Sequence, residues 1–140
     1  MKEMELVCKW YEKAKNDLIV AEHSFEDLYP RQIEISCYHC QQAIEKALKG
    51  FLLYNEIDPP KTHNLIMLCQ MCMEIDDSFE EILDDCTELT SYGVITRYPN
   101  EVEITEAESK IAIRKSKEIH NFCISLIQEL KQNQSFDMHL

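Results

Sequence analysis

The side chains best suited to chemistry in this chain lie in one segment, residues 41–50. Gln42, Glu45, Lys46 and Lys49 recur every three or four residues, which places them on one side of a helix. Lysines on a stiff helix hold point charges at fixed positions, so this side can bind a nucleotide phosphate or an acidic partner. The alternative is an internal Glu45–Lys49 ion pair that only supports the helix. We predict that these four residues bind a ligand or a partner.

Three more binding candidates lie outside this segment. His63 follows the proline-containing turn at residues 58–60, a position that also suits a capping or packing histidine. Tyr98 lies between Arg97 and a proline, and the proline favours extended backbone at Tyr98, which would fix the direction of Arg97. This pair lies in the longest irregular connection of the chain, and long ordered loops are often functional. We add His63, Arg97 and Tyr98 to the predicted binding residues.

Cysteines occur in two pairs with a spacing that zinc sites use, Cys37 with Cys40 and Cys69 with Cys72. Both pairs fall on the apolar sides of predicted helices, where a free thiol packs as a small hydrophobic group. Seven cysteines cannot all pair with one another, and their helical positions favour reduced thiols. We expect core packing, with no metal site and no cofactor; zinc binding is the alternative.

The net charge limits the classes of partner. The chain has 140 residues, a formal net charge of -12 and a pI near 4.8. Nucleic-acid binding through a broad surface needs clustered Lys and Arg, so a broad DNA-binding surface is excluded, although a local basic pocket is not. Because the chain shows no apolar signal segment and no membrane-spanning stretch, we expect a cytoplasmic protein without membrane contact.

Apolar periodicity predicts the elements that hold these side chains. Only two glycines and four prolines interrupt the chain, which favours helices over hairpins. We predict helices over residues 3–28, 31–55, 63–75, 79–92 and 106–130. Thr62 is the expected N-cap of the third helix, and Thr105 with Glu108 forms a capping box before the last. The predicted fold class is all-α, an antiparallel up-and-down bundle of four long helices plus a shorter helix. Residues 1–131 form its single domain, and 132–140 form a flexible C-terminal tail.

Several stretches resemble the HEPN family of small helical domains. They are Trp10, Ala14 and Asp17-Leu18, then Gln41 to Lys49, then His63-Asn64-Leu65, and finally Arg97-Tyr98-Pro99. The resemblance implies a helical bundle, commonly a homodimer, similar to the substrate-binding helical domain of some nucleotidyltransferases. It also implies pairing with a minimal nucleotidyltransferase in a toxin–antitoxin-like system.

Other branches of the HEPN family are metal-independent ribonucleases with an Arg-x4–6-His motif, which Arg114 and His120 match. A histidine can act as general acid or base, and a guanidinium can stabilise the charge of a phosphorane. On one helix, residues six apart lie about 120° apart around the axis. Arg114 and His120 would therefore meet at one phosphate only with help from a dimer mate.

We therefore predict a HEPN-like nucleotide-binding or partner-binding module that forms a homodimer and has no catalytic activity of its own. A metal-independent endoribonuclease using Arg114 and His120 is the first alternative. A structural dimer without a ligand is the second. The sequence does not predict which nucleotide binds or which protein is the partner. The nucleotide can be part of an RNA.

Overall fold

The computed structural model describes residues 3–94 and 98–138 of the chain, with side chains up to residue 133. This part contains five α-helices, two short three-ten helices and no strand. The elements are α1 (Met4–Glu26), α2 (Ile33–Tyr54), α3 (Leu65–Met73), η1 (Asp77–Ile82), α4 (Leu83–Leu89), η2 (Thr90–Gly93) and α5 (Glu106–Met138). The predicted all-α fold class is confirmed.

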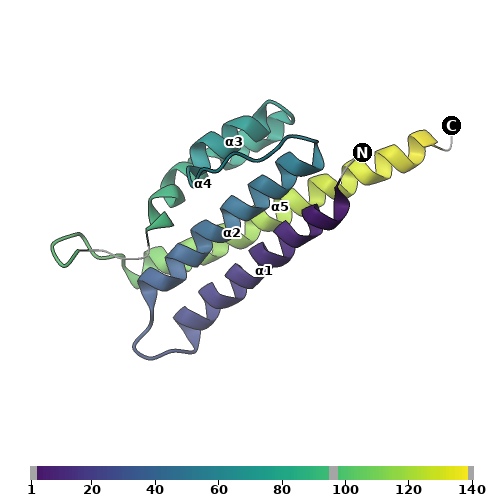
Figure 1. The fold of residues 1–140 in the computed structure, drawn as a ribbon. Coiled ribbons are helices and arrows are strands. Elements are labelled where there is room, and N and C mark those ends of the chain that lie inside the picture. Colours follow the sequence, from purple (N-terminus) through teal and green to yellow (C-terminus); the bar gives the residue numbers. More distant parts are fainter. Residues whose placement is uncertain (1–2, 95–97, 139–140) are drawn as a thin grey trace.

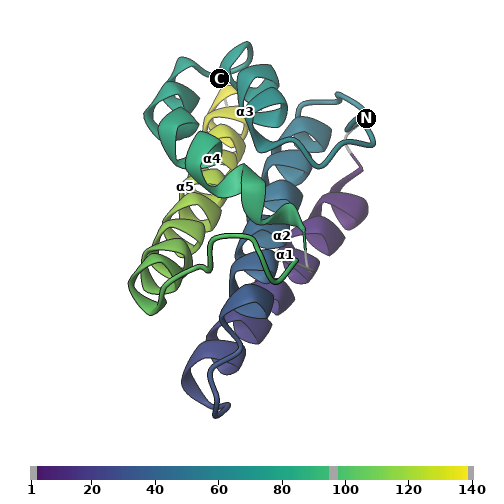
Figure 2. The same ribbon diagram turned by 90° about the vertical axis from the view of Figure 1, so that its left-hand side faces the viewer.

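α2 is the central helix of the bundle. The Tyr11 hydroxyl donates to the backbone oxygen of Ala47 over 2.7 Å, and the Ser36 hydroxyl donates to that of Ala21 over 2.8 Å, so α1 and α2 run antiparallel. Figure 2 shows α1 on one side of α2 and the short α3 and α4 helices on the other. α1, α3 and α5 all pack against α2, which explains why most of its residues are buried.

The segment 55–64 runs back along α2 before α3 begins. The amide of Gln41 donates to the backbone oxygen of His63 over 2.9 Å, and the Cys72 thiol donates to that of Leu48 over 3.7 Å. α3 therefore starts beside the middle of α2 and runs parallel to it, which departs from simple up-and-down alternation. The segment 55–64 thereby forms a wall along α2, and we call it the wall segment.

The predicted N-cap of α3 is wrong by two residues. The Asn64 side chain accepts hydrogen bonds from the backbone N–H groups of Ile66 and Met67, over 2.9 and 3.2 Å. The Thr62 hydroxyl instead accepts from the N–H of Asn64. Thr62 therefore shapes the turn before the helix, while Asn64 satisfies the first free donors of the helix itself.

The predicted fourth helix is divided into η1, α4 and η2. Phe79 and Ile82 are buried and three residues apart, a spacing that a three-ten helix places on one side. The Phe79 ring packs against Phe51 and Phe122, with centroids 4.6 and 5.1 Å away. The one-sided pattern was therefore correct, although only residues 83–89 adopt α-helical geometry.

α5 begins with the predicted capping box. The N–H of Thr105 donates to Oε1 of Glu108, and the N–H of Glu108 donates to the Thr105 hydroxyl, both over 3.1 Å. The helix continues to Met138, and Figure 1 shows its end extending past the bundle. The domain limit at residue 131 and the flexibility of 132–140 stay predictions, and residues 139 and 140 lie outside the described part. Although α5 has 33 residues, no described helix combines the length and apolarity needed to cross a membrane.

Candidate functional site

A buried glutamate on α2 organises the first part of the site, which we call the glutamate half. The Glu45 residue is 4% exposed, and each of its carboxylate oxygens accepts a different donor. Nδ1 of His63 lies 2.8 Å from Oε1, and the ammonium of Lys49 donates to Oε2 over 3.1 Å. Because a carboxylate accepts from Nδ1–H, Nε2 of the exposed His63 ring is left for a ligand. Glu45 thus fixes the direction of both groups.

A buried aspartate on α1 organises the second part, the aspartate half, in the same way. Oδ1 of Asp17 lies 2.8 Å from Nδ1 of His39, and the ammonium of Lys46 donates to Oδ2 over 2.5 Å. The Tyr38 ring packs edge-on against His39, with centroids 5.2 Å apart. Each half therefore holds one buried carboxylate, one histidine oriented through Nδ1 and one lysine. Both lysines are held in place before any ligand arrives.

Gln41 ties the wall segment to α2. Besides its bond to the backbone of His63, its Oε1 accepts from Nε2 of Gln42 over 2.8 Å. A Cβ atom placed on Gly93 would lie 3.2 Å from Cδ of Gln41, so η2 also packs against this amide. The buried Gln41 side chain thus positions the backbone that carries His63.

Trp10 lies where α1 approaches α2 closely, at Gly50. A Cβ atom on Gly50 would lie 2.7 Å from the Tyr11 ring and 3.2 Å from Cβ of Trp10, so only glycine permits this approach without movement. The ammonium of Lys49 lies 5.9 Å from the centroid of the Trp10 ring, within cation–π range. The half-buried indole therefore adjoins the glutamate half of the site.

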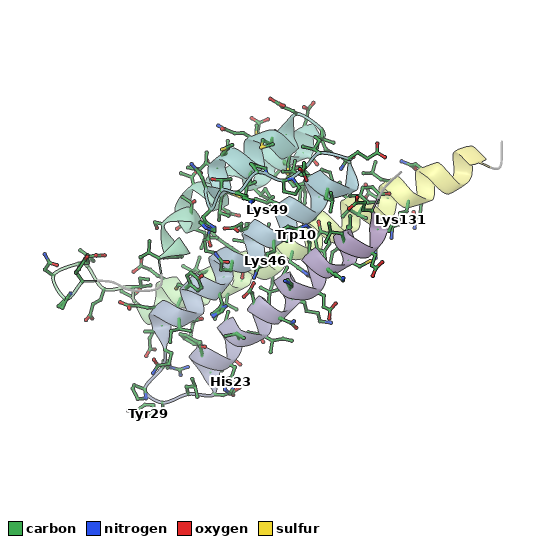
Figure 3. The ribbon with its side chains drawn as sticks, viewed as in Figure 1. Trp10, His23, Tyr29, Lys46, Lys49 and Lys131 are labelled. Atoms are coloured by element: carbon green, nitrogen blue, oxygen red, sulfur yellow. The ribbon has the colours of Figure 1, made fainter. Side chains whose placement is uncertain are left out.

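The structure brings together most of the predicted binding residues. Three of them meet in the glutamate half: Glu45, Lys49 and His63. Gln42 is linked to it only through Gln41, which binds the backbone of His63. Lys46 belongs to the aspartate half. Figure 3 shows Lys46 and Lys49 beside Trp10, between α1 and α2. The polar side of α2 therefore contributes to both halves of one continuous face.

The predicted loop pair is not part of this arrangement. Tyr98 is 75% exposed, and its backbone N–H donates to the carboxylate of Glu101 over 3.2 Å. Figure 1 shows the connection before α5 projecting from one end of the bundle. Arg97 lies outside the described residues. A binding role for these two residues stays a prediction.

Arg114 and His120 lie on different sides of α5. The Arg114 side chain is 60% exposed and donates to Glu118 over 3.3 Å. His120 is 7% exposed, and its ring packs edge-on against Tyr11 with centroids 6.0 Å apart. Burial lowers the pKa of His120 below its usual value of 6.5, and Nε2 makes no hydrogen bond with any residue of the described part. Within one protomer, the two side chains do not face a common point.

The sequence interpretation did not include Asp17, His39, Gln41 and Trp10 among the candidate site residues. One signal for Asp17 was available, because it lies on the stripe of α1 that also buries Ala14 and Ala21. A carboxylate at an apolar position of a helix needs a polar partner inside the protein. That signal indicates a buried ion pair, although it cannot name the residues on α2 that complete it.

The two cysteine pairs belong to the core. All four thiols are buried, and burial raises the pKa of the Cys40 thiol to about 12. Burial likewise raises the pKa of the Cys72 thiol, so both stay protonated near neutral pH. Among the described residues, no group of three or more His, Cys, Asp or Glu side chains is arranged to hold a metal ion.

The chain matches the family model described as the HEPN domain over residues 7–130. This range covers both halves of the site and nearly all of the bundle. No curated protein and no solved structure gives a significant match to the chain. The family match is therefore the comparison that bears on function.

Proposed function

The chain belongs to the HEPN domain family, and we propose that it is a non-catalytic binding module that takes a nucleotide on the face between α1 and α2. In the cell, this module forms a homodimer and pairs with a minimal nucleotidyltransferase in a toxin–antitoxin-like system in the cytoplasm. The pairing rests on the resemblance of residues 41–49 to HEPN proteins that are paired with nucleotidyltransferases. The geometry of the site supports the ligand class.

The observation that carries the proposal is the presence of two lysines held by buried carboxylates on one face. In a chain with a net charge of -12, an acidic phosphate group needs a local concentration of cationic groups in order to bind. Lys46 and Lys49 are held by Asp17 and Glu45, so their ammonium groups need little reorganisation on binding. Remaining ammonium protons can donate to phosphate oxygens.

Isothermal titration calorimetry with nucleoside mono-, di- and triphosphates tests nucleotide binding. We expect saturable binding that Lys49→Ala weakens by about fivefold, the equivalent of roughly 1 kcal/mol for one charge-assisted contact. Lys131→Ala removes the same charge from an exposed position on the far part of α5 and should have no effect. Equal affinities for both variants would contradict the placement of phosphate on this face.

Co-expression with a nucleotidyltransferase from the same genome tests the pairing. Light scattering after size-exclusion chromatography should report a homodimer alone and a larger complex with the partner. A monomer that passes through the column separately from the nucleotidyltransferase would contradict both parts. A dimer that binds neither nucleotide nor protein would instead support the structural alternative.

A metal-independent ribonuclease is the second candidate function, because Arg114 and His120 match the Arg-x4–6-His motif. Burial lowers the pKa of His120, and its buried Nε2 could accept a proton from a ribose hydroxyl only if the ring became accessible. Arg114 points away from this ring within one protomer, so a dimer mate would have to supply the guanidinium. Wild-type cleavage of RNA in EDTA that His120→Ala abolishes would establish this function.

A further inference from the structure

A hollow that borders the site opens beside Trp10. Its volume is about 320 Å³, and its lining includes Trp10, Lys49, Leu53, Pro59, Pro60 and Lys61. Small-molecule sites begin at about 300 Å³. Apolar side chains and two prolines form its walls, so its shape is fixed by the wall segment as well as by the helices.

The Trp10 indole offers a flat surface for an aromatic ring. It lines this hollow and also a smaller one of about 120 Å³. Aromatic side chains on rigid elements stack nucleobases regardless of base identity, because every base has a π face. The Trp10 backbone belongs to α1, a regular helix that packs against α2. A planar ring of nucleobase size therefore has a stacking partner here.

Four lysines line the two hollows beside the indole. Lys49 and Lys61 line the larger hollow, and Lys9 and Lys13 line the smaller one. Lys49 is 7% exposed, and Glu45 holds its ammonium toward the Trp10 ring. A ligand that stacks on Trp10 would therefore bring any attached phosphate within the reach of fixed and mobile ammonium groups.

Two carboxylates complete the larger hollow. Glu3 and Asp58 lie on its lining and are opposite in charge to the lysines. Carboxylates accept hydrogen bonds, and the hydroxyls of a ribose and the exocyclic amines of a base are donors. An inorganic anion or a simple aromatic acid would leave these acceptors unused, whereas a nucleotide uses donors, ring and phosphate together.

We propose that this hollow is a mononucleotide site in which a nucleobase stacks on Trp10 and its phosphate binds Lys49 and Lys61. The inference rests on the proposed nucleotide-binding function and assigns that function to one pocket. The same chemistry can come from a free nucleoside monophosphate or from the phosphorylated end of an RNA. Trp10 and Lys61 are central to this site, and neither was among the binding residues predicted from the sequence.

Fluorescence of the single tryptophan tests the site directly, because Trp10 is the only emitter of its kind in the chain. Adenosine monophosphate should quench Trp10 saturably, and adenosine or inorganic phosphate alone should bind at least roughly tenfold more weakly. Lys61→Ala alters an exposed residue and should weaken binding of the monophosphate by about fivefold, while Lys131→Ala should leave its affinity unchanged. Measured by calorimetry, Trp10→Ala should weaken binding of adenosine monophosphate roughly tenfold to a hundredfold.

RNA oligonucleotides with and without a terminal phosphate distinguish the two sources. Tighter quenching by the phosphorylated RNA than by the monophosphate would support the site with an RNA end as its ligand. Suppose that calorimetry shows binding with the same affinity for wild type and Lys61→Ala, while Trp10 emission does not change. This result would overturn the site but leave the proposed nucleotide-binding function intact. No binding of any probe by either method would overturn the site and the nucleotide-binding function together.

Discussion

Nδ1 of His63 lies 2.8 Å from Oε1 of Glu45, although the two residues are 18 positions apart in the sequence. The same carboxylate accepts from Lys49 over 3.1 Å. Glu45 therefore connects the wall segment before α3 to the buried ammonium group on α2. Because this one side chain supports a loop, a lysine and the neighbourhood of Trp10, its removal should affect stability and binding together.

Glu45→Gln keeps the size of the side chain but removes its charge. The ammonium of Lys49 would then be buried without a counterion, and breaking a buried pair costs about 3–5 kcal/mol. We expect a loss near the lower end of that range in the free energy of unfolding, measured with urea at neutral pH. Glu12→Gln, at an exposed position on α1, should change it by less than about 0.5 kcal/mol. Similar losses in both variants would show that the Glu45 contacts contribute no more to the free energy of unfolding than an exposed carboxylate does.

Gly50→Ala should destabilise the protein although alanine is the better helix former by about 1 kcal/mol. The added Cβ would lie 2.7 Å from the Tyr11 ring, and this ring is held by its hydrogen bond to Ala47. Overpacking of this kind costs roughly 1–3 kcal/mol, so we expect a net loss in urea unfolding. In a Tyr11→Ala background, the same change should cost less or become stabilising. A gain in stability from Gly50→Ala alone would refute the close approach of α1 and α2.

The pH dependence of stability should report the buried state of His120. Burial lowers its pKa in the folded protein, whereas the unfolded chain takes up the proton near 6.5. Below that pH, the unfolded state binds more protons, so stability present at higher pH is lost as the pH falls. Between about pH 7 and pH 5, the free energy of unfolding should fall more steeply for wild type than for His120→Phe. Parallel curves would mean that His120 titrates normally in the folded state.

No RNA cleavage is expected from the isolated protein. Arg114 is paired with Glu118 on the exposed side of α5, whereas His120 packs against Tyr11, so no single phosphate can reach both in one protomer. End-labelled single-stranded and transfer RNA should stay intact during incubation in EDTA. Cleavage by wild type that disappears in an identically prepared His120→Ala sample would reverse this conclusion.

Local features of the structure could be predicted from the sequence. The helical periods, the capping box at Thr105 and Glu108, and the polar side of α2 depend on residues within a few positions of one another. Such interactions are fixed by helical spacing alone. Their prediction therefore needed no knowledge of how the helices pack.

The cross-element contacts of the site could not be predicted in this way. The bond from Asp17 to His39 depends on the register between α1 and α2, and that from Glu45 to His63 depends on the return path of residues 55–64. Neither register nor path has a local sequence signal. The division of residues 77–93 into three short helices likewise depends on the packing of Phe79 against Phe51 and Phe122.

Solution NMR of the isotope-labelled protein during titration with adenosine monophosphate tests the central claim most directly. Because the chain has one tryptophan, its spectrum contains a single indole N–H signal, which belongs to Trp10. We predict that this signal and the backbone amides of Lys49 and Lys61 shift together and saturate, while the amides around Arg114 and His120 do not move. Shifts confined to the surroundings of Arg114 and His120, or none at all, would contradict a nucleotide site between α1 and α2.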